Sequence, residues 1–404
     1  MRVLFLAHRI PFPPDKGDKI RSYNVLKYLA ERHQVTLLCP IEQKGDLKYV
    51  GKLDSILHRT IFAYLNPVQR KLGMLKNLFT GKPLSVANFW SASLKRKLDE
   101  LISAEKFDAI YVFSSTMAEY VWDVDVPAKI IDFCDLDSAK FLQFSENAGF
   151  YSRWLYKMEA ARLLTYEQRA AASFDHILFI SPAEKELFES NGFSHKLLVM
   201  SNGVDLEQYF GEDLPVRNSP ANHSVPHIAF TGMMNYLPNV DAVLWFSKNV
   251  LPLLQKEKPG LIFYILGKNP VAKVRALHNP DEGIIVTGYV KDMKASLVGA
   301  DVFVAPMRIA RGMQTKILEA MACGTPVVSS FASARGIDAE NGVELLTADS
   351  PYEYAKQIIT ILDDLKVASR LRNNAFEFLK KKFNWETNLH ILDEMMQDEQ
   401  AFTQ

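Results

Sequence analysis

Continuous apolar runs alternate with helical patterns along this chain, and they constrain its fold more than any other feature. A buried strand of a parallel sheet has such a run because helices cover both of its faces. Strand, helix and strand in that order form the βαβ unit from which parallel sheets are built. In the first half we predict a helix from about residue 19 to 32 and strands at VLFLAH (3–8), VTLLCP (35–40), AIYVF (109–113), AKIIDFC (128–134), HILFIS (176–181) and KLLVM (196–200).

The same succession begins again after GEDLPVRNSPANHSVP (211–226), a stretch with the composition of a linker. A chain of 404 residues is also too long for one ordinary core. We therefore predict an α/β protein with two doubly wound domains, 1–205 and 206–380, and a closing helix over 381–404 that could pack back on the first domain. In the second domain, strands are expected at HIAFTG (227–232), LIFYILG (261–267), IIVTGYV (284–290), DVFVAP (301–306) and PVVSS (326–330).

Composition and charge exclude several classes of protein. The chain is 48% hydrophobic and 23% charged with a net charge of zero, which suits a globular protein and argues against wholesale nucleic-acid binding. Its three scattered cysteines lack metal-ligand spacing and fit a reducing compartment. The apolar run within residues 1–14 is too short for a signal peptide, and no window approaches a membrane span. We expect a cytoplasmic protein.

The stretch DVFVAPMRIARGMQTKILEAMACGTPVV (301–328) is predicted to form a strand, a loop, a helix, a turn and a strand. Ligands of such sheets bind beyond the carboxyl ends of the strands, so the cleft between two facing domains is the expected site. Gly312 would let the backbone approach a ligand, and the N-terminal end of the next helix favours a diphosphate. Glu319, about two turns into that helix, could accept hydrogen bonds from sugar hydroxyls. The alternative is an ordinary helix-to-strand connection.

Several separated elements resemble the family-4 retaining glycosyltransferases of the GT-B fold. LEAMACGTPVV (318–328) looks like their donor site, SNGVDLEQYF (201–210) resembles the element that enters the second domain, and GADVFVAP (299–306) is similar to the strand before the donor loop. The elements occur in the family's order over nearly the whole chain. Three further stretches resemble a narrower group, the sugar transferases associated with bacterial exopolysaccharide (PEP-CTERM/EpsH-type) systems. They are RIPFPPDKGDKIRSYN (9–24), CDLDSAK (134–140) and FTGMMNYLPN (230–239).

The sequence departs from the family's pattern at two charged positions. The resemblance implies two glutamates eight positions apart; the second is Glu319, with the implied role of binding the nucleotide ribose, and the first falls on Arg311. Many relatives also carry an Arg–Lys pair after the glycine that corresponds to Gly232, where this chain has no cation. Because a diphosphate leaving group needs counter-charge, we hypothesise that Arg308, Arg311 and Lys316 supply it instead. The alternative is that Lys316 only pairs with Glu319 on the helix surface.

The candidate residues for donor chemistry come from these elements. Arg311 and Lys316 are the candidates for a catalytic role, and no side-chain nucleophile is named because the resemblance implies that the donor phosphate acts as the base. The donor-binding candidates are Gly17, Gly232, Arg311, Gly312, Met313, Gln314, Lys316 and Glu319.

The first domain offers candidates for the acceptor side. PFPPDKGDKIR (11–21) is a predicted strand-to-helix loop with Gly17 at its turn and Asp18 as a plausible N-cap; the resemblance implies that it faces the diphosphate or the acceptor. IIDFCDLDSAK (130–140) places Asp132, Asp135 and Asp137 at the carboxyl end of a strand, where acceptor binding and simple capping are the two interpretations. Of all these, the acceptor-side candidates are Lys19, Asp135 and Asp137.

Metal chemistry is not expected. The Asp-x-Asp pattern at 123–125 could suggest a metal site. The second-domain motifs argue against the single-domain fold in which such a pattern carries the metal, so we expect no metal and no other cofactor. His8 and His33, beside the first two strands, are expected to be structural.

A basic, aromatic segment of the first domain indicates a membrane surface. Between Ser55 and Leu98 there is no acidic residue, and FYSRWLYK (150–157) repeats the pattern. This composition is typical of a segment that lies on an anionic membrane. The alternative is a solvated face over an ordinary core. The segment's eight basic residues are Arg59, Arg70, Lys71, Lys76, Lys82, Lys95, Arg96 and Lys97.

We therefore expect transfer of a sugar, with retention, from a nucleoside diphosphate sugar to a lipid-linked or growing glycan in exopolysaccharide or cell-surface glycan synthesis. Peripheral attachment to the inner membrane face would follow from residues 55–98. One alternative is a sugar-nucleotide epimerase of similar fold, which would require acid–base carboxylates and a histidine in the cleft. Another is a non-catalytic nucleotide-binding or scaffold member of the fold, which Arg311 makes plausible.

Overall fold

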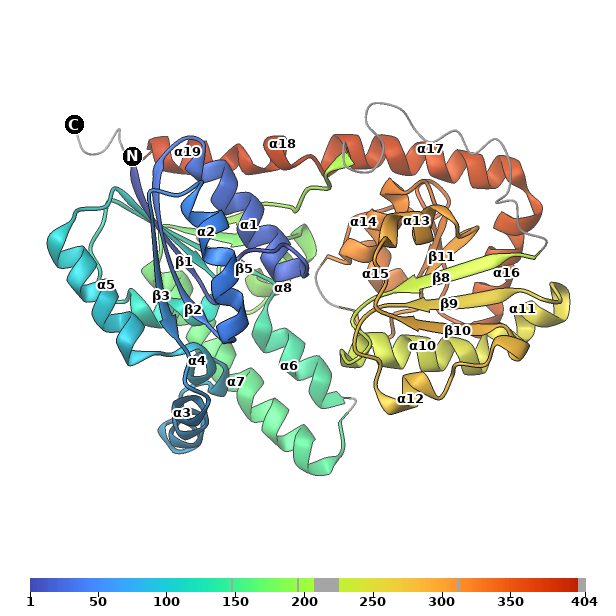
Figure 1. Cartoon of the computed structure of the whole chain (residues 1–404), viewed down its shortest axis with the longest axis horizontal. Helices are drawn as coiled ribbons and strands as arrows, with labels where there is room; N and C mark the ends of the chain where they lie inside the picture. Colours follow the sequence, from blue (N-terminus) through green and yellow to red (C-terminus); the bar gives the residue numbers. More distant parts are fainter. Residues whose placement is uncertain (147, 195, 207–224, 311–312, 399–404) are drawn as a thin grey trace. The chain divides into compact units, whose positions relative to one another are not determined.

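The computed structural model of the chain describes residues 1–146, 148–194, 196–206, 225–310 and 313–398 (Figure 1). It contains two compact units. The first comprises Met1–Asn202 together with Glu386–Gln404, and the second comprises Gly203–Trp385. No helix in the described part of the chain is both long enough and apolar enough to span a membrane.

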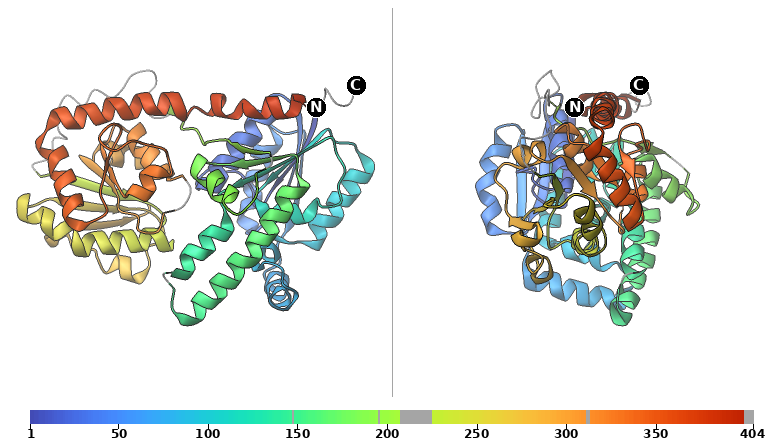
Figure 2. Two further views of the ribbon diagram at one scale, coloured as in Figure 1. Left: turned by 180° about the vertical axis from the view of Figure 1, so that it is seen from behind. Right: turned by 90° about the vertical axis from the view of Figure 1, so that its right-hand side faces the viewer.

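The first unit is built on a seven-stranded sheet in the order β3-β2-β1-β4-β5-β6-β7, in which every neighbouring pair is parallel. All carboxyl ends of its strands therefore lie at one end of the sheet. The central strands are buried because helices cover both faces (Figures 1 and 2). The strands are β1 (Arg2–Ala7), β2 (Gln34–Ile41), β3 (Arg59–Tyr64), β4 (Ala109–Phe113), β5 (Ala128–Cys134), β6 (His176–Phe179) and β7 (Leu197–Val199).

Two helices of the first unit, α6 and α7, form a hairpin that projects from its body (Figures 1 and 2). The C-terminal helix α19 packs on this unit, since the Tyr28 hydroxyl donates to Asp393 Oδ2 at 2.6 Å. The helices are α1 (Gly17–Ala30), η1 (Lys44–Tyr49), α2 (Val50–Asp54), α3 (Pro67–Thr80), α4 (Leu84–Phe89), α5 (Ala92–Ala104), η2 (Ser115–Tyr120), α6 (Asp137–Glu146), α7 (Phe150–Ser173), α8 (Pro182–Glu189) and α19 (Ile391–Asp398).

A buried ion pair ties α1 to the sheet. Arg21 Nε donates to Asp132 Oδ2 at 2.7 Å and Nη2 donates to Oδ1 at 3.0 Å, and both side chains are fully buried. Arg21 Nη1 donates to the Met200 carbonyl at 2.7 Å and to Asn202 Oδ1 at 2.9 Å, so the guanidinium is satisfied without water. Asp132 therefore does not face a ligand at the strand end, because its carboxylate is committed to the core.

The second unit repeats the architecture with six parallel strands in the order β10-β9-β8-β11-β12-β13. Its core is aromatic at the centre, with Phe230, Phe246, Phe263 and Phe303 fully buried. The strands are β8 (His227–Thr231), β9 (Ile262–Leu266), β10 (Ile284–Gly288), β11 (Val302–Ala305), β12 (Val327–Ser329) and β13 (Leu346–Thr347). The helices are α10 (Leu237–Asn249), α11 (Leu251–Glu257), α12 (Ala272–Arg275), η3 (Pro280–Glu282), α13 (Met293–Val298), α14 (Thr315–Ala322), α15 (Phe331–Arg335), α16 (Pro351–Asp363) and α17 (Leu365–Lys382), and α18 (Trp385–Leu389) follows at the boundary of the units.

Some elements differ from the expectation. The first helix spans Gly17–Ala30 instead of about 19–32. Strands β3 and β13 were not predicted. In the case of β3, the basic flanks of RTIFAY hid an edge strand that pairs with β2 over its whole length. The segment 55–98 is therefore a strand and three helices of the folded unit and not one surface segment.

Candidate functional site

The second unit has its topological switch point between β8 and β11. The connection through α10 leads from β8 to β9 on one side, and the connection through α14 leads from β11 to β12 on the other. The loop after β8 and the start of α14 thus come together at the carboxyl ends of two adjacent parallel strands. Open α/β sheets bind their ligands at this kind of crevice.

The sequence of α14 explains why the helix forms and ends there. Five of its eight residues, among them Leu318 and Met321, are buried against the core of the unit. Gly324 ends the helix with a φ of 65°, which a residue with a side chain adopts only at a cost. Arg372 Nε donates to the Gly324 carbonyl at 2.9 Å, so the turn into β12 is fixed. The N-terminal end of α14 is consequently held in place at the switch point.

Lys316, in the first turn of α14, reaches the loop that follows β8. Its Nζ donates to Asn239 Oδ1 at 2.5 Å and lies 4.4 Å from the centre of the Phe230 ring. Asn239 in turn donates through Nδ2 to the Met233 carbonyl at 3.0 Å. A Cβ on Gly232 would come within 2.5 Å of the Asn239 amide nitrogen, so the glycine is required for this close packing. Lys316 thus extends a basic side chain from α14 to the loop after β8.

The environment of Lys316 disfavours its charge. Burial lowers the pKa of Lys316 to about 7, and the neighbouring Glu319 only partly opposes this. Burial likewise raises the pKa of Glu319 to about 7, with Lys316 opposing. In the described part of the chain, Lys316 Nζ has no carboxylate within 4 Å. A desolvated ammonium without a close counter-ion is a suitable partner for an anion such as phosphate.

Three expectations about this helix need correction. Glu319 is the fifth residue of α14, little more than one turn from its start, because the helix begins at Thr315. The alternative, in which Lys316 only pairs with Glu319 on the helix surface, is wrong, because the Lys316 ammonium contacts Asn239. Arg308 does not face the helix entrance as a spare cation, since its guanidinium forms a two-pronged pair with Asp241 on α10.

The remaining donor candidates divide into described and undescribed residues. Arg311 and Gly312 lie outside the described residues. Met313 packs against the core of the second unit, and Gln314 occupies the N-cap position of α14 without a side-chain capping bond.

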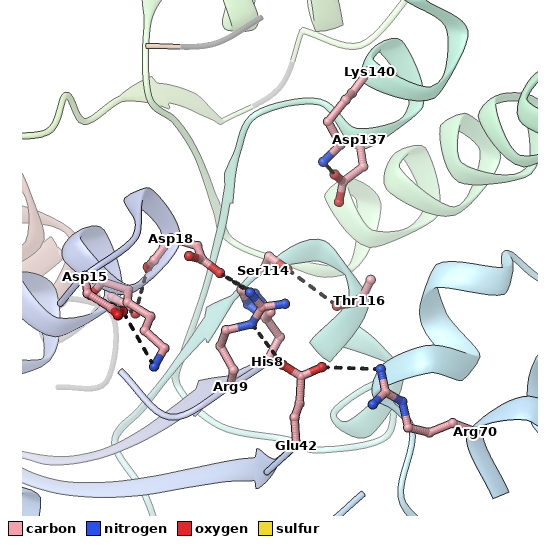
Figure 3. Close-up of polar contacts among 12 residues, drawn as sticks. His8, Arg9, Asp15, Asp18, Glu42, Arg70, Ser114, Thr116, Asp137 and Lys140 are labelled. Carbon is pink, nitrogen blue, oxygen red and sulfur yellow. Dashed lines mark hydrogen bonds and ion pairs between the residues drawn. The ribbon is translucent and has the colours of Figure 1, made fainter. Parts of the chain in front are cut away.

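In the first unit, charged side chains gather where β1 and β2 end (Figure 3). Asp18 forms an ion pair with Arg9, whose Nη1 atom lies 2.8 Å from Oδ2, and the same carboxylate lies 3.2 Å from His8 Nε2. Arg9 Nε lies 3.5 Å from Glu42, which Arg70 also approaches at 3.3 Å. Although burial raises the pKa of Asp18, His8 and Arg9 together hold it well below its usual range. This network was not predicted: His8, Arg9 and Asp18 lie within one short segment, but Glu42 and Arg70 are far from them along the chain.

The loop before α1 differs from its expected role. Asp18 is not the N-cap: Lys16 occupies that position, and Asp18 lies in the first turn, where it pairs with Arg9. A Cβ on Gly17 would meet no atom within 4 Å, so packing within the chain does not require glycine there. Lys19 is buried, with its Nζ 4.0 Å from Asp15.

The acidic residues after β5 have different environments. Burial, with Glu184 nearby, raises the pKa of Asp135 to about 7, although Lys140 opposes it. The Oδ1 atom of Asp135 is buried and has no hydrogen-bond partner among the described residues. Asp137 pairs with Lys140 and lies apart from the His8 group in Figure 3. Asp135 is therefore the acceptor-side candidate with an unused acceptor atom.

The described residues contain no group of three or more His, Cys, Asp or Glu side chains that could hold a metal ion.

Comparisons with known proteins identify the fold. Residues 225–364 match the family described as "Glycosyl transferases group 1". Anabaena Alr3699/HepE, whose structure was determined with UDP, superimposes with a TM-score of 0.69 at 16% identity over 98% of this chain and all of that one. Sucrose-phosphate synthase from Thermosynechococcus elongatus gives 0.70 at 16% identity over 99% of each chain. The chain has the GT-B fold. The fold class predicted from the sequence is confirmed.

One relative matches the GT-B chain over almost its whole length. It is an "Uncharacterized 44.6 kDa protein in cps region" of Klebsiella pneumoniae, 22% identical over 404 residues, which cover 95% of this chain and 96% of the relative.

Proposed function

We propose that this chain is a glycosyltransferase that moves a sugar from a nucleoside diphosphate sugar to a lipid-linked or growing glycan, with retention of configuration. The observation that carries the proposal is Lys316, a desolvated cation delivered by α14 to the loop after β8 at the switch point of the sheet. The group 1 glycosyltransferase match over residues 225–364 and the UDP and UDP-glucose complexes of HepE support it.

In this proposal the second unit binds the donor. The diphosphate lies against Lys316 Nζ and the N-terminal N–H groups of α14, where the helix dipole also favours negative charge. Glu319, on the same helix, accepts hydrogen bonds from the ribose hydroxyls. Arg311 and Gly312 stay candidates for this site on sequence grounds.

Charge develops on the diphosphate as the reaction proceeds. The bond from the sugar C1 to the phosphate oxygen breaks, and C1 forms a bond to the acceptor oxygen. The acceptor's hydroxyl proton passes to the leaving phosphate, as the family resemblance implies. An ammonium positioned before the reaction stabilises the leaving diphosphate more than the intact donor, which lowers the barrier. No metal or other cofactor is required in this scheme.

The first unit is proposed to bind the acceptor at the carboxyl ends of β1, β2, β4 and β5. In this proposal the Asp135 carboxylate, whose buried Oδ1 atom has no hydrogen-bond partner among the described residues, accepts a hydrogen bond from an acceptor hydroxyl. Asp137 and Lys19 stay candidates. We extend the proposal to exopolysaccharide or other cell-surface glycan synthesis because of the subgroup motifs, and because the Klebsiella relative is described as a protein in a cps region.

A panel of nucleoside diphosphate sugars tests the proposed function. The purified chain is incubated with each donor and a mixture of lipid-linked and oligosaccharide acceptors, and free nucleoside diphosphate and glycosylated product are measured. Transfer releases one nucleoside diphosphate for each sugar added. An epimerase that inverts the sugar and keeps it on the nucleotide would change the donor's sugar without that release, and a scaffold would bind nucleotide and change nothing.

A further inference from the structure

Helix α3 presents an unpartnered apolar stripe to solvent. Val68, Leu72, Leu75 and Phe79 are all exposed, and Phe79 is 86% exposed. Their spacing of four, three and four residues, at about 100° per residue, confines them to an arc of about 60° on the helix surface. The opposite side of α3 packs on the protein at Gly73, where an added Cβ would lie 3.5 Å from the Cβ of Ala87 on α4. The stripe therefore faces away from the body of the unit.

Two lysines flank this stripe, one on each side. At the same 100° per residue, Lys71 lies about 60° from Val68 on one side around the helix axis. Lys76 lies about 80° from Val68 on the other side. Both are exposed, and neither has an ion-pair partner within 4 Å among the described residues. The other basic residues between 55 and 98 are mostly committed: Arg59 pairs with Glu105, Arg70 with Glu42, Lys82 with Glu119, Lys95 with Asp99, and Lys97 donates to the Phe62 carbonyl.

The hairpin of α6 and α7 carries a second exposed apolar group at its end. Phe150 and Tyr151 are 83% and 88% exposed, Trp154 is 65% exposed, and Leu142 on α6 is exposed as well. The basic residues Arg153 and Lys157 lie among them, and residues 148–158 include no acid. The end of the hairpin is stiffened by a cluster of three rings, Phe141, Phe144 and Tyr156, with centroids about 6 Å apart.

Two charged groups of α7 join α3 and the hairpin into one rigid body. Arg162 donates to the carbonyls of Asn77 at 2.9 Å and Leu78 at 3.0 Å, the last turn of α3. Glu159 accepts from the backbone N–H groups of Leu84 and Ser85, both at 2.8 Å, at the start of α4. The cation thus meets the negative end of one helix dipole and the anion the positive end of the next. Helix α3 and the end of the α6–α7 hairpin project from the same side of the unit (Figures 1 and 2).

We propose that these two parts, the α3 stripe with Lys71 and Lys76 and the hairpin end with Phe150, Tyr151 and Trp154, form one docking surface for an anionic lipid bilayer. The lipid-binding element is narrower than residues 55–98 and includes a part of α7 outside them. Charge complementarity favours lipid over a protein partner, because α3 and residues 148–158 of the hairpin carry cations and no acid. The exposed Glu146, at the end of α6, is the acid nearest to this part of the hairpin in sequence. Exposed Trp and Tyr beside Lys and Arg are suited to the headgroup region, where one end of the ring is apolar and the other wet.

Vesicle binding tests the proposal in the full chain and without nucleotide-sugar, so the result does not depend on sugar transfer. The probes are vesicles of phosphatidylcholine alone and of phosphatidylcholine with phosphatidylglycerol. The wild type should bind the anionic vesicles and bind neutral ones much less. Lys71→Gln with Lys76→Gln should weaken binding about 25-fold, since each surface cation contributes about fivefold, or ~1 kcal/mol.

Apolar variants separate the two parts of the surface. Leu72→Ser with Phe79→Ser on α3, and Tyr151→Ser with Trp154→Ser on the hairpin, should each weaken binding at least about tenfold. Tyr352→Ser and Lys356→Gln are the matched controls, because both residues are exposed on α16 of the second unit and should leave binding unchanged. Circular dichroism melting verifies that every variant is folded.

Brominated lipids locate the hairpin end directly. They should quench the fluorescence of the wild type in anionic vesicles, and most of that quenching should be absent in Trp154→Phe. Equal binding to neutral and anionic vesicles, or an unaffected hairpin variant, would overturn the proposal. A dimer that does not bind vesicles, and that the apolar variants convert to a monomer, would also overturn the proposal. A second copy of the chain would then cover the surface.

Discussion

Replacing Lys316 with Met separates a phosphate-binding role from a structural one. Methionine keeps the unbranched apolar stem of lysine and removes only the ammonium. If the ammonium contacts the donor diphosphate, the variant loses a charged hydrogen bond of about 1.5–3 kcal/mol. The affinity for a nucleoside diphosphate should then fall about 10- to 150-fold. The affinity for the nucleoside should not change, because only the diphosphate presents the charge that Lys316 neutralises.

The same substitution should stabilise the protein without ligand. Burial lowers the pKa of Lys316 from 10.5 to about 7, which at ~1.4 kcal/mol per pKa unit corresponds to roughly 5 kcal/mol against the ammonium in the folded state. Part of the gain is offset by the lost bond to Asn239. We expect the free energy of unfolding at neutral pH to rise by roughly 1–4 kcal/mol. Because the unfolded chain binds the proton more tightly, this gain should be complete below pH 7 and should fade as the pH rises toward 10.5.

The affinity of the wild type should also depend on pH with a definite sign. Lys316 is protonated below its pKa of about 7, so nucleoside diphosphate binding should weaken as the pH rises from about 6.5 to about 8.5. Lys316→Met should lack that dependence. Isothermal calorimetry with UDP and uridine is the assay, with UDP as the first choice because it is the ligand of the HepE complex. Lys356→Met, at an exposed lysine on α16, is the control.

One result would refute the reasoning about Lys316. If Lys316→Met leaves the ratio of diphosphate to nucleoside affinity unchanged while the protein becomes less stable, the lysine is a structural partner of Asn239. The proposed donor site would then lack its cation.

Three further predictions concern the other sites. Glu319→Ala should weaken nucleotide-sugar binding by about 1.5–3 kcal/mol in calorimetry, and a folded variant with unchanged affinity would remove Glu319 from the donor site. Arg21→Met should lower the free energy of unfolding by about 3–5 kcal/mol in a denaturant titration, since the Asp132 carboxylate would stay buried and unpaired. Adding Asp132→Asn should recover part of the loss, and no recovery would show that the unpaired carboxylate is not its cause. The KM for the acceptor should fall as the pH rises through about 7, where Asp135 ionises, in the wild type but not in Asp135→Asn; parallel pH profiles would exclude Asp135 from acceptor binding.

The sequence alone determined the fold class of this protein. Buried parallel strands are specified by local composition, because covering both faces of a sheet requires apolar runs such as AIYVF and HILFIS. The position of α14 after β11 could likewise be predicted, since its apolar face and its terminating Gly324 are local signals. Strand β3 was missed because its local signal is weak: it lies at the edge of the sheet, where only one of its six residues is buried.

The partners of charged side chains were decided only by the tertiary structure. Lys316 contacts Asn239, 77 positions earlier in the chain, and Arg21 pairs with Asp132, 111 positions later. Nothing in the spacing of these residues indicates that they pair. The spacing of Lys316 and Glu319 did suggest a surface pair, but the two side chains do not form that close contact. Local sequence determines which face of an element is apolar. Whether a charged group at its end meets solvent, a counter-ion or an empty position suited to a ligand depends on which elements the folded sheet brings together.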